Sequence, residues 1–311
     1  MSRVQSLFRT KQDQPLVFQN ESAMRNRVSA ENPAFNCLVT ARPLSDKRNA
    51  DSGKKNDPIT HTSSGDFKMI SGDQQASPPL TCRECTLGRL TVYGPTRESA
   101  PNEIYNRRRS VSSFTAHRTF LKEGAAPRQM HILYSGWAFR FKQLADGRRQ
   151  ILSFLIPGDL VALENLCFAG LPLPFSVRSL THVSLCTFDI DDMRYITQSS
   201  DEQNQKLAAT MHDHVMNMNR CLVDIGRRSA LGRVAQLILE LESRLRARFL
   251  SVDGVFFFPA RQEDIADALG LTTVYVNRTL DRLRRDGIID FSRRRMVIRN
   301  PGALHKVAEE E

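Results

Sequence analysis

The chain has 311 residues, which is enough for two domains and a tail, and its 41% hydrophobic content is enough for real cores. No apolar run approaches the roughly 20 residues that a membrane helix needs, and the N-terminus has no apolar signal-peptide core. Six cysteines in a chain of this length do not make the dense framework of a secreted scaffold. We therefore expect a cytoplasmic protein with no membrane partner, and the formal net charge of +10 favours a polyanionic one.

Residues 1–78 are rich in polar side chains and proline and show no sustained apolar period, so we expect a disordered tail. Met69 stands just before the patterned region, and we hypothesise that translation starts there. Cys82 and Cys85 then form a C-x-x-C. Two thiols at this spacing can clamp one metal atom, but zinc and iron–sulfur sites generally have four protein ligands. A metal site and a pair of reduced thiols therefore both stay open.

Between residues 117 and 188, short apolar runs alternate with glycines that fall eleven or twelve residues apart. Turn signals at this spacing indicate an antiparallel sandwich or barrel, and Asp146-Gly147 is the strongest hairpin signal. The glycines are Gly124, Gly136, Gly147 and Gly158, and the expected strands are Thr119–Lys122, Met130–Tyr134, Trp137–Leu144, Arg149–Leu155, Leu160–Leu163 and Val183–Phe188.

One long helix is expected from Asp201 to Ile225, because apolar residues recur there in alternating steps of four and three. This pattern is typical of the seam of a helix pair, so we expect a homodimer. The alternative is that the same stripe packs onto the chain's own sheet domain. A second amphipathic helix is expected over Ser229–Phe249. The seam consists of Leu207, Met211, His214, Met218, Cys221 and Ile225.

The residues from Arg261 to Arg285 predict two short helices joined by a tight turn. Gly270 stands where a helix C-terminus favours a positive φ, and Thr272 is able to cap the next helix. A helical hairpin with a solvated, charged face is the alternative interpretation. Apolar residues at helical spacing would pack the two helices together, and these are Ile265, Ala266, Leu269, Leu271, Val276, Leu280 and Leu283.

The second helix leaves a polar face outside this apolar stripe. Thr273, Val274, Asn277 and Arg278 lie on that face. Asn and Arg can bond to base edges with two hydrogen bonds at once, so the face favours recognition of double-stranded DNA in the major groove.

A cationic surplus coincides with the helix pair. From residue 226 to residue 299 there are fifteen Arg, no Lys and nine Asp or Glu. After the helices, two short apolar strands flank Arg293, Arg294 and Arg295. We expect this wing to contact phosphate oxygens, which positions a domain without reading sequence.

Three segments carry a family likeness, in this order: FLKEGAAPRQMHILYSGWAFRF, FLIPGDLVALENL and ARQEDIADALGLTTVYVNRTLDRLRRDGII. From about Cys82 to Ile298 the chain resembles the bacterial transcription regulators typified by the cyclic-AMP receptor protein and the fumarate and nitrate reduction regulator. The resemblance implies an α+β fold with a cyclic-nucleotide-binding-type β jelly roll (79–200), a dimerisation helix (201–226), a winged helix-turn-helix (227–299) and a tail (300–311). It also implies a homodimer that binds a palindromic operator and contacts RNA polymerase.

The family's base-reading positions match Thr273, Val274, Asn277 and Arg278, and Arg278 matches an arginine that contacts guanine. The family's phosphate-contacting positions match Gln262, Thr272 and Tyr275. Val274 replaces a glutamate that is common in these regulators. Because valine cannot accept a hydrogen bond from cytosine and offers only apolar contact to a thymine methyl, the operator should differ from those of the two relatives.

The resemblance also bears on cofactors. Nucleotide-binding members have a Gly-Glu pair and an Arg followed by a small residue in the effector pocket, and here the matching positions are Ala162, Leu163, Leu173 and Pro174. A cyclic phosphate would lack its guanidinium partner, so we expect no response to cyclic AMP. Iron–sulfur-sensing members use four cysteines, which Cys82, Cys85 and Cys186 match at three places, with Thr91 at the fourth. An iron–sulfur cluster is the minority hypothesis, and no cofactor is the favoured one.

We expect a transcription regulator and no enzyme, because no nucleophile with a base, phosphate loop or paired ligand set stands out. The alternative is a ligand- or redox-sensing module that acts through protein partners and binds DNA weakly and without selectivity. Sequence-selective retardation of DNA would separate the two.

Overall fold

The computed structural model describes residues 107–310, with gaps at 168–169 and 199. The predicted tail over residues 1–78, the start at Met69 and the pair Cys82 and Cys85 lie outside the described residues.

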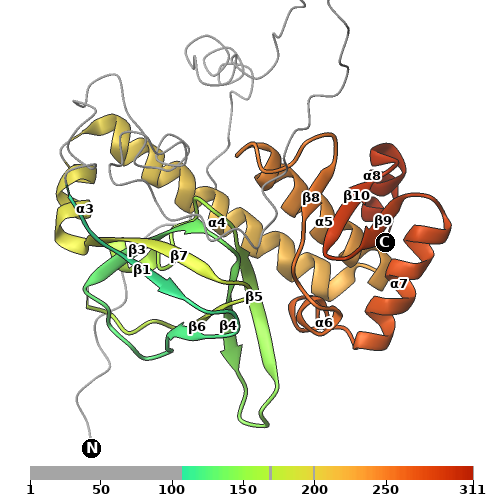
Figure 1. The fold of residues 1–311 in the computed structure, drawn as a ribbon, viewed down its shortest axis with the longest axis horizontal. Coiled ribbons are helices and arrows are strands. Elements are labelled where there is room, and N and C mark those ends of the chain that lie inside the picture. The colour runs from blue at the N-terminus through green and yellow to red at the C-terminus, as the bar shows by residue number, and fades with distance from the viewer. Residues whose placement is uncertain (1–106, 168–169, 199, 311) are drawn as a thin grey trace, which may run out of the picture. The chain divides into compact units, whose positions relative to one another are not determined.

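The first part of the described chain is a pair of antiparallel sheets (Figure 1). One has the order β1-β7-β3, and the other has the order β2-β6-β4-β5. Apolar side chains such as Leu133, Val177 and Leu185 form a core that draws on both sheets. The strands are β1 Arg108–Phe114, β2 Thr119–Leu121, β3 Gln129–Ser135, β4 Ala138–Gln143, β5 Arg149–Leu155, β6 Ser176–Ser179 and β7 Val183–Asp189.

Glycines make the turns between these strands, as their spacing predicted. Gly147 lies in the β4–β5 hairpin with a φ of 84°. At Gly136, a Cβ atom would stand 2.0 Å from the carbonyl oxygen of His182. Both close approach and a φ of 83° therefore require glycine there.

The strand prediction was wrong in one place and incomplete in two. Residues 160–163 form a buried turn before the short helix α2 (Glu164–Cys167), with an isolated bridge from Leu160 to Ile132. All four side chains are buried, so the run has no alternation of faces. Strands β1 and β6 were missed because their sequences, RRSVSSF and SVRS, are mostly polar.

Helix α3 (Ile190–Gln198) leads into the long helix α4 (Asp201–Arg227), which Ser200 caps. The first part of the predicted seam faces inward, since Leu207 is buried with the β-domain core and Met211 packs against it. This corrects the prediction for these two residues, because the chain's own sheets already cover them. The exposed apolar side chains of α4 lie further along, and they are Val215, Met216, Met218, Leu222, Val223 and Ile225.

The C-terminal part combines four helices with the small sheet β8-β10-β9. Its elements are α5 Ala230–Arg246, β8 Val255–Phe257, α6 Gln262–Leu269, α7 Thr273–Arg285, β9 Ile289–Ser292, β10 Arg295–Ile298 and α8 Pro301–Glu309. The predicted tail at 300–311 is wrong, because α8 buries Leu304 and Ala308 in the core. Asn300 caps this helix and Pro301 opens it, a start signal that was readable in the sequence.

One apolar core continues from β4 and β5 into the C-terminal part. It joins Phe139 and Phe154 of the strands to Phe256 and Phe258. The single tryptophan, Trp137, lies in this core with its ring 5.8 Å from that of Phe258. In the described residues, no helix is long and apolar enough to cross a lipid bilayer.

Candidate nucleic-acid interface

Helices α6 and α7 form the predicted helix-turn-helix, and the turn between them is built by two residues. Gly270 closes α6 in the left-handed conformation with a φ of 63°, and its N–H bonds to the carbonyl of Ala266. Thr272 caps α7 by accepting a hydrogen bond from the backbone N–H of Tyr275 at 3.3 Å. The positive φ predicted for Gly270 and the cap predicted for Thr272 are both confirmed.

The apolar stripe locks the two helices into the core, as its spacing predicted. Val276 and Leu283 are 0% exposed, and Leu271 is half-buried at the edge of the core. The remaining buried members are Ile265, Ala266, Leu269 and Leu280.

The opposite face of α7 is exposed, and the four predicted base readers lie on it. Val274 is 59% exposed although it is apolar. Asn277 accepts a hydrogen bond from the side-chain amide of Gln262 at 3.0 Å. This bond links a predicted phosphate contact on α6 to a predicted base reader and orients the Asn277 amide. Thr273 and Arg278 are exposed beside them.

The wing is a hairpin of β9 and β10 with Arg293 and Arg294 at its tip. Both residues have positive φ values, 48° and 63°, and Ser292 pairs with Arg295 across the turn. The carbonyl of Arg294 accepts a hydrogen bond from the N–H of Phe258 at 2.8 Å. Because Phe258 directly follows strand β8, this bond holds the tip of the wing against the end of β8. All three arginines are exposed, and the predicted strands on both sides are confirmed.

Three of the four positions that match the family's effector pocket lie in the apolar cores of the β domain. Ala162, Leu163 and Leu173 are buried, whereas Pro174 is exposed. Arg140 points into the same core and bonds to Glu164 at 3.0 Å and to the carbonyl of Leu160 at 2.9 Å.

Sequence reasoning missed Arg140, although an arginine between two phenylalanines of a strand is a visible irregularity. Its guanidinium lies 5.0 Å from the ring centre of Phe175. Burial lowers the pKa of Arg140, and the charge of Glu164 works against this. Glu164 in turn lies 3.3 Å from the Nε2 atom of His214 on α4. Burial favours the neutral carboxyl, but His214 and Arg140 outweigh it and hold the Glu164 pKa below its usual range.

The remaining predicted residues divide between core and surface. Cys186 is buried in β7 among apolar residues, whereas the other two matched cysteines lie outside the described residues. Within the described ranges, no group of three His, Cys, Asp or Glu side chains is placed to hold a metal ion. Cys221 is exposed on α4, and partial burial of its thiol raises the pKa.

Comparisons with known proteins match both parts of the chain. The Crp-like helix-turn-helix domain matches residues 232–307, and the cyclic nucleotide-binding domain matches residues 111–200. The transcriptional activatory protein AadR of Rhodopseudomonas palustris is 29% identical over 225 residues, which are 69% of this chain and 90% of that protein. The nitrogen fixation regulation protein FixK of Bradyrhizobium diazoefficiens is 28% identical over 238 residues, 73% of this chain and 93% of that protein.

A solved structure agrees with these matches. FixK2 from Bradyrhizobium japonicum has a TM-score of 0.58 and 27% identity, and the match covers 65% of this chain and 98% of that one. The two matched domains occur in the order that the structure shows, with α4 between them. The chain therefore belongs to the Crp/Fnr family of DNA-binding transcription regulators.

Proposed function

We propose that the chain binds a palindromic operator as a homodimer and reads bases through Thr273, Val274, Asn277 and Arg278. The observation that supports this is the free face of α7, where these side chains are exposed while the opposite face is locked in the core. Arg278 offers two donors to guanine, and Val274 offers an apolar contact to a thymine methyl.

Phosphate contacts would surround this face. Gln262 lies at the N-terminus of α6, and Thr272 and Tyr275 lie at the N-terminus of α7, where helices favour anions. The wing at residues 293–295 supplies three exposed cations at a second point. Such contacts would fix the register of α7 on the duplex without reading bases.

The dimer would form along the exposed part of α4. Met218, Leu222 and Ile225 share one helical face there and are 55%, 70% and 39% exposed. Apolar residues exposed at this spacing are typical of a helix-pair seam. Cys221 lies within the same stretch, where its raised pKa favours the neutral thiol and hence packing.

We infer that cyclic AMP is not the effector, because Arg140, which is buried in the β domain, is already paired with Glu164. A buried cyclic phosphate would need a cation that is not already paired. The protein would act in the cytoplasm by binding, not by catalysis. The names of relatives such as AadR, an activatory protein, favour RNA polymerase as the partner on DNA.

The test is selection of duplexes from a randomised library by the purified protein, followed by retardation titrations on the selected site. Arg278→Ala should weaken binding by about 1 to 3 kcal/mol and relax the preference at one base pair. Arg282→Ala is the matched control, since Arg282 is an exposed arginine in the last turn of the same helix. Failure to select any sequence would refute the proposed function, and an equal loss on all duplexes would assign Arg278 to phosphate.

A further inference from the structure

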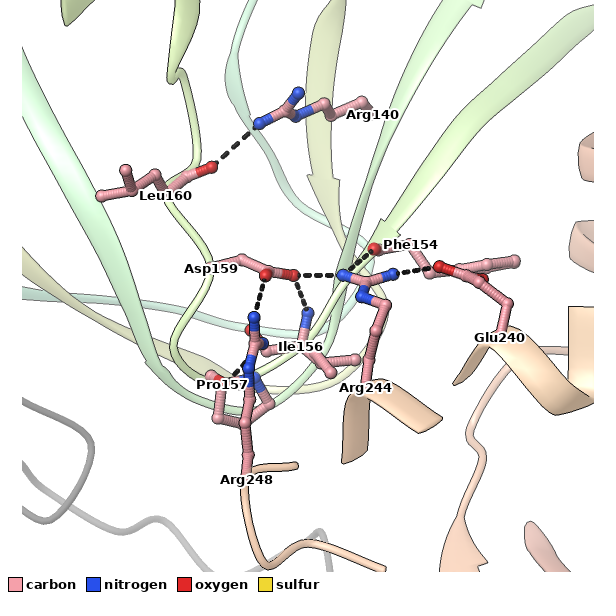
Figure 2. Close-up of polar contacts among 9 residues, drawn as sticks. All are labelled: Arg140, Phe154, Ile156, Pro157, Asp159, Leu160, Glu240, Arg244 and Arg248. Carbon is pink, nitrogen blue, oxygen red and sulfur yellow. Dashed lines mark hydrogen bonds and ion pairs between the residues drawn. The ribbon is translucent and has the colours of Figure 1, made fainter. Parts of the chain in front are cut away.

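Asp159, in the turn after β5, binds two arginines of the C-terminal part (Figure 2). One carboxylate oxygen accepts from Arg244 at 2.6 Å, and the other accepts from Arg248 at 2.7 Å. The first oxygen also accepts the backbone N–H of Ile156 at 2.8 Å. The side chain of Asp159 is 13% exposed, so this is a nearly buried junction between the β domain and the end of α5.

The two arginines also bind groups in β5, in the turn after it and on α5. Arg244 donates to the carbonyl of Phe154 at 3.2 Å and to Glu240 at 2.8 Å. Arg248 donates to the carbonyl of Pro157 at 2.9 Å. Two positive and two negative charges therefore meet at one place, and the opposing charges hold the Asp159 pKa below its usual range despite burial.

The other end of β5 is bound to α6, the first helix of the helix-turn-helix. Arg149 donates to Asp267 and, at 2.6 Å, to Asp264. The side-chain amide of the next residue, Gln150, donates to the carbonyl of Ala268 at 3.2 Å. Asp264 also accepts the backbone N–H of Arg261, the N-cap residue of α6, so Arg149 is bonded to a side chain that closes the start of this helix.

These two attachments lie at opposite ends of a strand of seven residues, roughly 20 Å apart. A single attachment would act as a pivot, whereas two separated attachments fix an orientation. The backbone leaves the helical conformation between α4 and α5, because Arg228 and Ser229 are extended there. Strand β5 is thus bound at both ends to the C-terminal part, through α5 and α6, while Leu207 of α4 packs into the β-domain core; we call the two attachments of β5 the splint.

We propose that Asp159 and Arg149 are positioning residues for operator binding, which hold α6 and α7 at one orientation to α4 and so set the half-site spacing. The proposal rests on the proposed function, in which two copies bind one operator through α7. The orientation comes from side chains of the folded chain and not from a bound small molecule. The base-reading face of α7 stays exposed in this arrangement, so the orientation leaves it ready for DNA.

If these residues position α7, their loss should weaken the preference for one half-site spacing. One base pair added between the half-sites moves them about 3.4 Å apart and turns one against the other by about 34°. A rigid dimer should therefore discriminate sharply between spacers, and a loosened one should not. The probe is the palindrome selected by the unaltered protein, remade with one or two base pairs added or removed at its centre.

Asp159→Asn keeps an acceptor for the Ile156 N–H but removes the charge that both arginines need. Arg149→Gln removes the ion pairs to Asp264 and Asp267 of α6. Each variant should lower the preference for the best spacer over its neighbours by about 3-fold or more, and the double variant should lower it further. Binding to a single half-site should change less than about 2-fold. The matched controls, Asp146→Asn and Arg148→Gln, alter an exposed pair in the hairpin and should leave the spacer preference unchanged.

Trp137 gives a second readout that needs no DNA. It is the only tryptophan, and its ring lies against Phe258 in the core that joins the β domain to the C-terminal part. It is 4% exposed, so acrylamide should quench its fluorescence weakly. The quenching constant should rise about 2-fold or more in the double variant and stay constant in the controls.

A folded double variant, checked by circular dichroism, with unchanged quenching or an unchanged spacer preference would overturn the proposal. Arg248→Gln, which leaves the bond from Arg244 to Asp159, replaces Asp159→Asn if that variant does not fold. If the unaltered protein selects no DNA, the proposed function fails and the positioning of α6 and α7 for an operator falls with it. The quenching result would then report only whether the splint itself exists.

Discussion

The pair of Arg140 and Glu164 inside the β domain allows a quantitative test of its electrostatics. The Arg140 side chain is 5% exposed, and Glu164 is its one salt-bridge partner among the described residues. Two atoms of the pair, Arg140 Nε and Glu164 Oε2, are buried without a hydrogen-bond partner in the described part of the chain. Glu164→Gln would leave an acceptor for Arg140 but remove the opposing charge.

Breaking a buried ion pair from one side typically costs 3–5 kcal/mol, because the remaining charge stays buried. Glu164 is 32% exposed, which lets water reach the altered side chain, so we expect the lower end, about 3 kcal/mol. For a folded region of about 200 residues this corresponds to a Tm lower by roughly 6–12 °C. The exposed pair of Glu123 and Lys142 is the control, and Glu123→Gln should cost less than about 1 kcal/mol.

Urea titrations of both variants and of Arg140→Met/Glu164→Gln would measure these free energies of unfolding. The double variant removes both charges, so it should be more stable than Glu164→Gln alone. The folded-state pKa of Glu164 is depressed, so its contribution is present above about pH 4.3 and is lost as the pH falls through the folded-state pKa. A double variant less stable than the single one, or an equal loss at pH 7 and well below pH 4, would refute this account.

Three further predictions concern the wing, the dimer and the cofactor. Replacing Arg293 and Arg294 by Gln should reduce the slope of log affinity against log salt by about 0.9 for each phosphate that the wing no longer neutralises, with the same preferred sequence in selection. Leu222→Glu puts a charge on the exposed face of α4 and should give a monomer by light scattering, whereas Glu at the exposed Leu171 of the β domain should not. Protein purified without oxygen should be colourless and free of iron, and calorimetry should detect no cyclic AMP binding; bound iron would support a cluster at Cys82, Cys85 and Cys186.

The helix-turn-helix was predictable from sequence because its signals are local. Gly270 and Thr272 each act through their own backbone, so one residue type at one position specifies the turn. The periodic spacing of Val276, Leu280 and Leu283 then decides which face of α7 is buried. The wing was predictable for the same reason, since two apolar runs flank a polar turn.

What the sequence did not show depends on contacts between distant residues. Leu207 faces inward because α4 packs against the sheets of the β domain. Apolar residues in alternating steps of four and three fit this packing as well as they fit a dimer seam, so the sequence could not separate the two. The salt bridges of Asp159 join residues that are 85 and 89 positions apart. No spacing rule connects such partners, because the fold alone brings them together.

The segment from Pro157 to Glu164 makes polar contacts with three parts of the chain. Asp159 holds the arginines of α5, while Leu160 and Glu164 bond to Arg140 in the sheet core, and Glu164 also meets His214 on α4. A turn and a short helix thus contact helix α4, the β-domain core and the DNA-binding part within eight residues. These contacts are ion pairs and hydrogen bonds, so a displacement of the segment would break them in several parts of the chain at once.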